Sequence, residues 1–232
     1  MPTKSFLPAW RTLLAGMLTP NEIALIFDLD NTLVMSNIDF AAVRHRLIDM
    51  LEEAGAANQP RATQMALALS ELIALGAGAG PSLVGRMWDV VRQAEREGLA
   101  RATLADRAGE VLSALHAQGY RLALLTNNAR EMLTERLEGY GLARYLEVVA
   151  TRDDVPALKP APDGIQRILA CLSTVRQAFM IGDAWIDAQA AHSAGIRFIG
   201  VGPRRDAVEA RGIPIWTWVN SISELLTLDF AG

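Results

Sequence analysis

The amino-acid sequence predicts an α/β protein: a Rossmann-like parallel sheet core with helices on both faces, and a small all-helical domain inserted after the first strand. The first observation is a series of short apolar runs, typical of strands buried on both faces: residues 23–27, 120–125, 146–150, 178–181 and 197–201. Each run is followed by polar or glycine-rich residues and then by a helical pattern, the alternation that builds parallel sheets. Residues 39–101 interrupt this alternation, because they show helical periodicity and no convincing strand.

Length, composition and charge fit an ordinary globular protein. The 232 residues are enough to bury a sizeable core, and 51% of them are hydrophobic against 21% charged. The formal net charge is −4, with 22 basic and 26 acidic residues spread along the chain, so nucleic acid is not an expected partner. No apolar run reaches the roughly eighteen residues of a membrane span. Cys171 is the only cysteine, which excludes an intrachain disulfide and favours a reducing, cytoplasmic location; we expect it to be buried on a helix.

The first 20 residues form a separate segment with apolar residues at helical spacing: Phe6, Leu7, Trp10, Leu13, Leu14, Met17 and Leu18. They lack the continuous apolar run and the small-residue cleavage site of a secretory signal. We expect residues 1–20 to form an amphipathic helix that docks on the body of the protein. Binding to a partner or to a membrane surface is the alternative.

The same patterns predict the domain boundaries: residues 21–36 and 102–232 form the α/β core, and residues 37–101 form a helical cap. Three helices are predicted in the cap, over residues 40–51, 63–75 and 83–94, with a glycine-rich loop at Gly76–Pro81. An insert at the carboxyl end of a strand lies over the crevice where α/β sheets bind ligands, so it is placed to act as a lid. Arg44 and His45 either reach a substrate carboxylate or second phosphate or are ordinary solvated charges, and the second interpretation is favoured.

Two aspartates directly follow the first predicted strand. Asp28 and Asp30 are two residues apart, so in an extended chain both side chains lie on the same side, near the carboxyl edge of the sheet. Two carboxylates at that separation repel each other, and a hard cation such as Mg²⁺ relieves the repulsion while binding phosphate oxygens. A polar strand end or a helix cap explains one aspartate readily and two less well. The pair therefore indicates a metal site.

Polar side chains also follow the next three strands. Thr126 and Asn127 lie at the entrance of a helix, where free backbone N–H groups favour an anion. Lys159 follows the third strand and would, taken singly, be interpreted as a solvent-facing lysine. Asp183 and Asp187 follow the fourth. Because the carboxyl ends of parallel strands meet at one edge, the set predicts a charge-balanced site for a phosphate and a divalent cation.

Local signals predict where several helices begin and end. Asn128 is expected to cap the helix that follows the second strand, and Gly141 to end it. Ser221 and Glu224 have the spacing of a capping box, which predicts a last short helix. Trp185, beside the last pair of aspartates, either shapes the ligand pocket or packs beneath its loop.

The ordered set of motifs resembles the haloacid dehalogenase (HAD) superfamily, in its phosphatase branch. The matching segments are Asp28-Leu29-Asp30-Asn31-Thr32, Leu125-Thr126-Asn127, Lys159-Pro160, and Gly182-Asp183 with Asp187. The helical insert resembles the C1-type cap of phosphoglycolate phosphatase-like and β-phosphoglucomutase-like members. The second acid, Asp30, favours phosphate esters as substrates, because the dehalogenase and phosphonatase branches lack an aspartate at that place.

The resemblance implies a role for each motif residue. Asp28 would be the nucleophile that forms an aspartyl-phosphate. Asp30 would protonate the leaving oxygen and then deprotonate the attacking water. Thr126 and Asn127 would bind the phosphoryl oxygens, while Lys159 would neutralise charge on the phosphate and the nucleophile.

The implied cofactor is Mg²⁺, bound by Asp28, the backbone carbonyl of Asp30, Asp183 and Asp187. The predicted activity is hydrolysis of a small organic phosphate monoester, phosphoglycolate- or sugar-phosphate-like. A phosphomutase of the β-phosphoglucomutase type is one alternative, and a catalytically silent phosphometabolite-binding protein is the other. The oligomeric state, including a homodimer, is left open.

Overall fold

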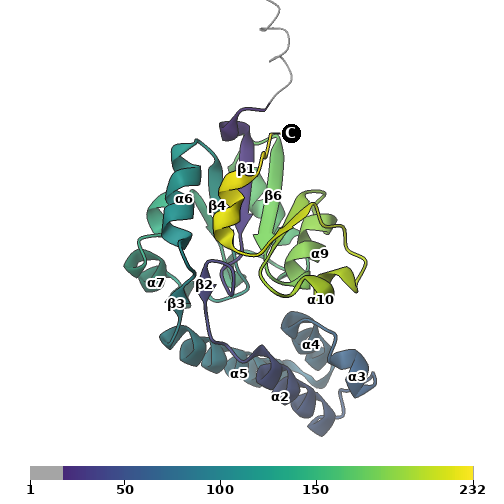
Figure 1. Cartoon of the computed structure of the whole chain (residues 1–232). Coiled ribbons are helices and arrows are strands. Elements are labelled where there is room, and N and C mark those ends of the chain that lie inside the picture. Colours follow the sequence, from purple (N-terminus) through teal and green to yellow (C-terminus); the bar gives the residue numbers. More distant parts are fainter. Residues whose placement is uncertain (1–17, 232) are drawn as a thin grey trace, which may run out of the picture.

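The computed structural model describes residues 18–231. At its centre is a six-stranded parallel sheet in the order β5-β4-β1-β6-β7-β8 (Figure 1). The strands are β1 (Ile23–Phe27), β4 (Arg121–Leu125), β5 (Val148–Ala150), β6 (Gln177–Gly182), β7 (Arg197–Val201) and β8 (Thr217–Val219). The predicted parallel sheet is confirmed, and β8 is an additional edge strand that was not predicted.

Helices cover both faces of this sheet, as predicted. Ile23, Leu25 and Phe27 of β1 pack on one face, and the alternate residues Ala24 and Ile26 pack on the other. The first face is covered by α6 (Ala108–Ala117), α7 (Thr134–Gly139) and the 3₁₀ helix η6 (Ile222–Thr227), and the second by α8 (Asp163–Cys171), α9 (Trp185–Ser193) and α10 (Arg205–Glu209). Shorter 3₁₀ helices are η1 (Pro20–Glu22), η3 (Arg130–Met132), η4 (Ala143–Tyr145) and η5 (Arg152–Asp154).

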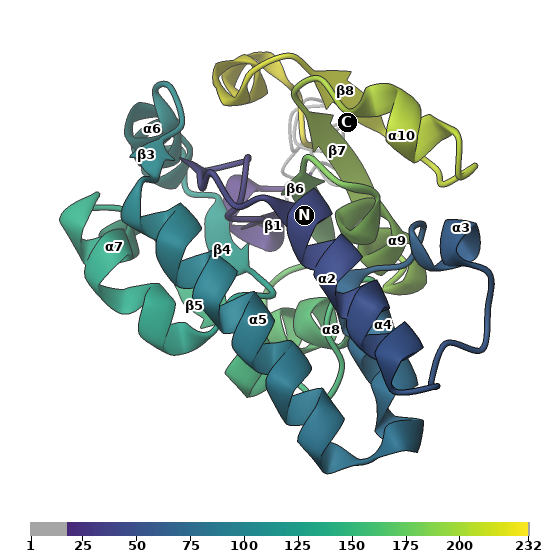
Figure 2. The same ribbon diagram turned by 90° about the horizontal axis from the view of Figure 1, so that it is seen from below.

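A separate helical layer lies beneath the carboxyl ends of the strands (Figure 1), and α2 and α5 cross in front of the sheet when the molecule is seen from below (Figure 2). Its elements are α2 (Phe40–Glu53), α3 (Arg61–Gln64), α4 (Leu69–Leu75), η2 (Gly76–Ala79) and α5 (Pro81–Ala100). The layer has an apolar core of its own, formed mainly by α2, α4 and α5. Two short antiparallel strands, β2 (Val34–Met35) and β3 (Thr103–Leu104), join it to the sheet region. Domain boundaries at residues 37 and 101 stay a prediction.

The second predicted helix, over residues 63–75, is wrong as a single element. The chain forms α3 and α4 instead, with a turn at Met65 and Ala66 and a bend at Leu67 between them. The Glu71 side chain accepts a hydrogen bond from the Ala68 backbone N–H at 2.7 Å, so a new helix begins there rather than the old one continuing. The carbonyl groups of Ala66 and Leu67 are thereby left for partners outside the helices.

Some local predictions hold and others are wrong. Gly141 ends α7 with a positive φ of 67°, as expected. Asn128 does not cap a helix but donates a hydrogen bond to Asp30, and the Ser221 side chain makes no cap hydrogen bond at η6.

Cys171, expected to be buried, is exposed at the end of α8. The predicted amphipathic helix falls mainly in residues 1–17, which lie outside the described residues. Among residues 18–231, no helix is long and apolar enough to cross a membrane.

Candidate active site

A cavity of about 340 Å³ lies where the carboxyl ends of the central strands meet the helical layer. Residues that follow β1, β4, β5 and β6 line one side of it, and residues of α2, α4 and α5 line the other. The four groups of polar residues predicted from the sequence therefore converge at one place. In Figure 1 the strand ends point toward the helical layer, which covers them. This is the position expected for a ligand site in an α/β sheet.

Lys159 is the centre of the polar network. Its ammonium group donates to Asp28 Oδ1 at 2.5 Å, to Asp187 Oδ1 at 2.6 Å and to the Leu125 carbonyl at 3.1 Å. The residue is only 3% exposed, so the solvent-facing interpretation of Lys159 taken singly is wrong. Burial alone would lower the pKa of Lys159, but the carboxylates of Asp187 and Asp28 hold it well above its usual value. The lysine is therefore a fixed positive charge between two buried acids.

Three buried carboxylates, those of Asp28, Asp183 and Asp187, offer oxygen atoms that all lie within 4.8 Å of one another. Gly182 makes room for this cluster, because a Cβ at that position would lie 2.5 Å from Asp187 Oδ2. Burial, and then the charge of Asp187, raise the pKa of Asp183 to about 7, while Arg204, 2.9 Å away, opposes the rise. An all-oxygen donor set with excess negative charge fits a hard divalent cation such as Mg²⁺.

Asp30 lies beside this cluster, and its side chain is not part of it. Asn128 Nδ2 donates to Asp30 Oδ2 at 2.8 Å, whereas Oδ1 is buried without a hydrogen-bond partner in the described part of the chain. Burial raises the pKa of the Asp30 carboxyl, and its hydrogen bonds oppose that rise. A buried carboxyl group with one oxygen free and a raised pKa keeps its proton to a higher pH than a solvated aspartate does, which suits a proton donor.

Thr126 and Asn127 directly follow β4, and Asn127 lines the same cavity. The Asn127 side chain holds the Lys159 backbone at both polar groups: its Nδ2 donates to the Lys159 carbonyl, and its Oδ1 accepts from the Lys159 N–H, each at 3.0 Å. Thr126 is buried, and its hydroxyl oxygen accepts from the Asn128 N–H at 3.2 Å. The cavity is thus lined by the predicted residues Asp28, Asp30, Asn127, Lys159, Asp183 and Asp187, whereas Thr126 is buried behind the lining. Asn127 also fixes the position of the Lys159 backbone.

Among the lining residues that were not predicted as site residues, Glu95, Asn128, Arg152 and Arg204 each make a polar contact within the site. Asn128 adjoins the predicted pair at 126–127, so its position alone was a usable signal. Arg204 lies three residues beyond the end of β7, again at a strand end. Glu95 and Arg152 are 57 residues apart and carry no local motif, so the sequence offers no signal for their pairing.

Fold and site together define an α/β enzyme whose buried aspartates and single buried lysine converge at the carboxyl ends of parallel strands. Residues 25–201 match the family model described as haloacid dehalogenase-like hydrolase. The chain belongs to this family. The resemblance predicted from the motifs is thereby confirmed.

The relatives agree with this assignment. A phosphoglycolate phosphatase (plasmid) of Cupriavidus necator is 31% identical over 190 residues, which cover 75% of this chain and 78% of that protein. The pyrophosphatase PpaX of Halalkalibacterium halodurans is 31% identical over 94 residues, which cover 40% of this chain and 44% of that protein. The crystal structure of a hydrolase from Pseudomonas syringae has the same fold, with a TM-score of 0.66 at 20% identity, and the match covers 88% of this chain and 96% of that one. The expectation of a phosphatase-type hydrolase is confirmed.

Proposed function

We propose that this enzyme hydrolyses a small organic phosphate monoester in a Mg²⁺-dependent reaction through an aspartyl-phosphate intermediate. The observation that carries the proposal is the buried contact between Asp28 and Lys159 beside the acids Asp183 and Asp187. The lysine offsets part of the negative charge on the nucleophile and the incoming phosphate, which would otherwise repel each other. The relatives named for phosphoglycolate phosphatase support a small phosphorylated substrate.

The residues of the chain have distinct proposed tasks. A carboxylate oxygen of Asp28 forms a bond to phosphorus as the bond to the leaving oxygen breaks, and Asp30 gives its proton to that oxygen. Asp30 then takes a proton from the water that hydrolyses the aspartyl-phosphate. Thr126 and Asn127 position the phosphoryl oxygens. Mg²⁺, held by Asp28, Asp183 and Asp187 with the Asp30 carbonyl, would supply positive charge to the phosphoryl group.

The test is a panel of phosphate esters assayed with Mg²⁺ for released phosphate, using the wild type, Asp28→Asn and Asp30→Asn. We expect release from the wild type, none from Asp28→Asn, a severe loss for Asp30→Asn, and loss of wild-type activity with excess chelator. Asp106→Asn, an exposed aspartate away from the cavity, is the matched control and should behave as the wild type. Near-normal turnover by Asp28→Asn would refute the assignment of Asp28 as the nucleophile. Isomerisation of a sugar phosphate without release of free phosphate would indicate a phosphomutase.

A further inference from the structure

The arginines of the cavity differ in one respect: whether an acid neutralises them. Three arginines line it, namely Arg44, Arg152 and Arg204. Arg152 pairs with Glu95 at 2.8 Å, and Arg204 pairs with Asp183 at 2.9 Å. Arg44 has no carboxylate partner among residues 18–231; its Nε donates to the Leu67 carbonyl at 3.2 Å. The side of the cavity formed by α2 therefore carries a positive charge that no acid of the described chain offsets.

A second guanidinium lies beside the first. Arg211, which follows α10 in the sheet region, donates through Nη2 to the Ala66 carbonyl at 2.5 Å, and its guanidinium carbon lies 3.6 Å from the centre of the Trp185 ring. The two adjacent carbonyl groups thus each accept from one arginine: Ala66 from Arg211 of the sheet region, and Leu67 from Arg44 of the helical layer. The described residues supply no carboxylate to Arg211 either.

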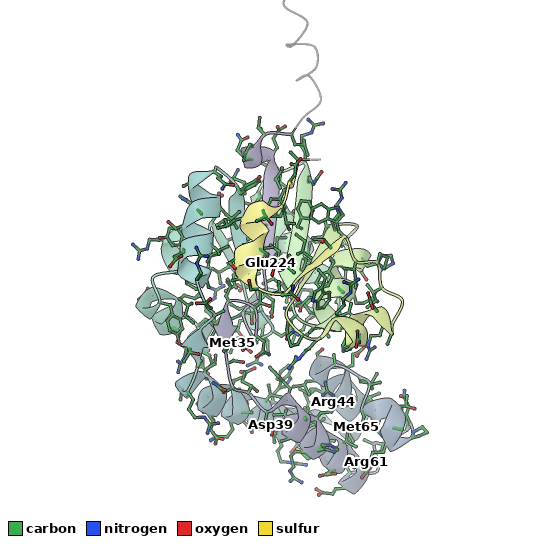
Figure 3. All side chains as sticks on the ribbon, in the orientation of Figure 1. Met35, Asp39, Arg44, Arg61, Met65 and Glu224 are labelled. Carbon is green, nitrogen blue, oxygen red and sulfur yellow. The ribbon has the colours of Figure 1, made fainter. Side chains whose placement is uncertain are left out.

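This arrangement is costly without an anion. Both guanidinium groups bind adjacent carbonyl groups, so two like charges lie close together in a partly buried place. Burial, and then the charge of Arg211, lower the pKa of Arg44. An oxyanion bound at Arg44 would relieve that repulsion, and the planar fork of a guanidinium suits two oxygen atoms of one group. Figure 3 labels Arg44 in the helical layer, nearer to the strand ends than Arg61. Arg61, by contrast, is already paired with Asp49 and Glu52.

We infer that Arg44 binds an oxyanion on the leaving group, so that the preferred substrate carries a second acidic group besides the phosphate being removed. This rests on the proposed function, because it assigns the two ends of one cavity: Asp28 and Lys159 face the reacting phosphate, and Arg44 faces the group released with the leaving oxygen. The second group is a carboxylate or a second phosphoryl group, which share this chemistry. A substrate whose leaving group is a neutral polyol would leave the positive charge of Arg44 without an anionic partner.

The test compares substrates that differ mainly in the charge of that group. The wild type and Arg44→Gln are assayed for kcat/KM on 2-phosphoglycolate, on 2-hydroxyethyl phosphate, which replaces the carboxylate with an alcohol, and on pyrophosphate. Loss of one charge-assisted contact predicts a fall of about 10- to 100-fold on the doubly acidic substrate and less than about threefold on the hydroxyethyl ester. The better wild-type substrate of 2-phosphoglycolate and pyrophosphate identifies the second group as carboxylate or phosphoryl. Arg61→Gln is the matched control and should leave the selectivity unchanged.

A binding measurement separates this inference from the proposed function. The affinity of the Asp28→Asn protein for 2-phosphoglycolate and for 2-hydroxyethyl phosphate is measured by calorimetry, with and without Arg44→Gln. Selective loss of 2-phosphoglycolate binding supports the anion subsite even if the wild type proves to release no phosphate, in which case only the proposed function fails. Equal losses for both ligands, or no loss for either, would overturn the role of Arg44.

Discussion

The pair formed by Glu95 of α5 and Arg152 of η5 gives the sharpest prediction about how the helical layer is held on the sheet. Arg152 Nη1 and Nη2 donate to the two Glu95 carboxylate oxygens at 2.8 and 3.0 Å, and the side chains are only 12% and 4% exposed. The guanidinium also lies 4.7 Å from the centre of the Trp88 ring. The Arg152 backbone N–H donates to the Asn128 carbonyl at 3.0 Å, so the pair ties α5 to the loop that carries Asn127.

Replacing Glu95 with alanine leaves the Arg152 charge buried without a partner. Breaking a buried ion pair in this way costs about 3–5 kcal/mol, and we expect the lower end because Arg152 keeps some access to water. A loss of about 3 kcal/mol in the free energy of unfolding corresponds to a decrease in Tm of roughly 6–12 °C for a chain of this size. Removing both partners also removes the unpaired charge. The double variant Glu95→Ala/Arg152→Ala should therefore be more stable than the sum of the single losses predicts, by about 2–3 kcal/mol.

The assay is thermal and urea unfolding of the wild type, both single variants and the double variant. The matched control is Arg61→Ala, which breaks an exposed pair with Asp49 and Glu52 and should cost less than about 1 kcal/mol. Strictly additive losses for Glu95 and Arg152 would refute the reasoning, because they would mean that the two charges do not interact.

Four further predictions follow from the site and the sheet. In Lys159→Met, the carboxylates of Asp28 and Asp187 lose their shared cation and repel each other when both are charged. Thermal unfolding should therefore show a loss of stability that is large at pH 8 and smaller at pH 5.5. An equal loss at both pH values would contradict this argument. Because the pKa of Asp183 is raised from 3.8 to about 7, its folded state binds the proton more tightly than the unfolded state. Stability of the metal-free protein should therefore fall as the pH rises from 4 to 7. Magnesium competes with that proton, so calorimetry should give an apparent affinity about tenfold higher at pH 8 than at pH 6; a pH-independent affinity would contradict this. Gly200→Ala places a Cβ 1.9 Å from Trp218 and should cost about 1–3 kcal/mol by urea unfolding, whereas the control Gly78→Ala, with open space around it, should not.

The central strands could be predicted because parallel strands buried on both faces produce continuous apolar runs. The edge strand β8 could not, since only Val219 of its three residues is buried and the run is too short. Within β8, Trp218 packs against Gly200 of β7. No pattern near either residue in the sequence predicts that contact. The same limit explains the broken helix between α3 and α4, where apolar periodicity continues through a turn that is set by capping at Ala68.

The cluster of polar side chains at the strand ends could be predicted, and for a related reason. Asp28, Thr126, Lys159 and Asp183 each follow a predicted strand, and the geometry of a parallel sheet brings all such positions to one edge. Asn128 was assigned to a helix cap because asparagine serves equally well as a cap and as a hydrogen-bond donor to a carboxylate. Only its distance of 2.8 Å from Asp30 distinguishes the two.

The arginines of the cavity differ in this respect, because what each of them binds depends on its partner in the folded chain. Arg44, Arg152 and Arg204 line the same cavity, yet two of them are neutralised by acids that lie far from them in the sequence. Arg152 draws its acid from α5, and Arg204 draws its acid from the end of β6. Arg44 differs because no carboxylate of the described chain pairs with it. This property arises from the folded structure and cannot be predicted from the residues near Arg44 in the sequence. This is why the motifs predict the family, whereas our inference about the leaving group needs the folded structure.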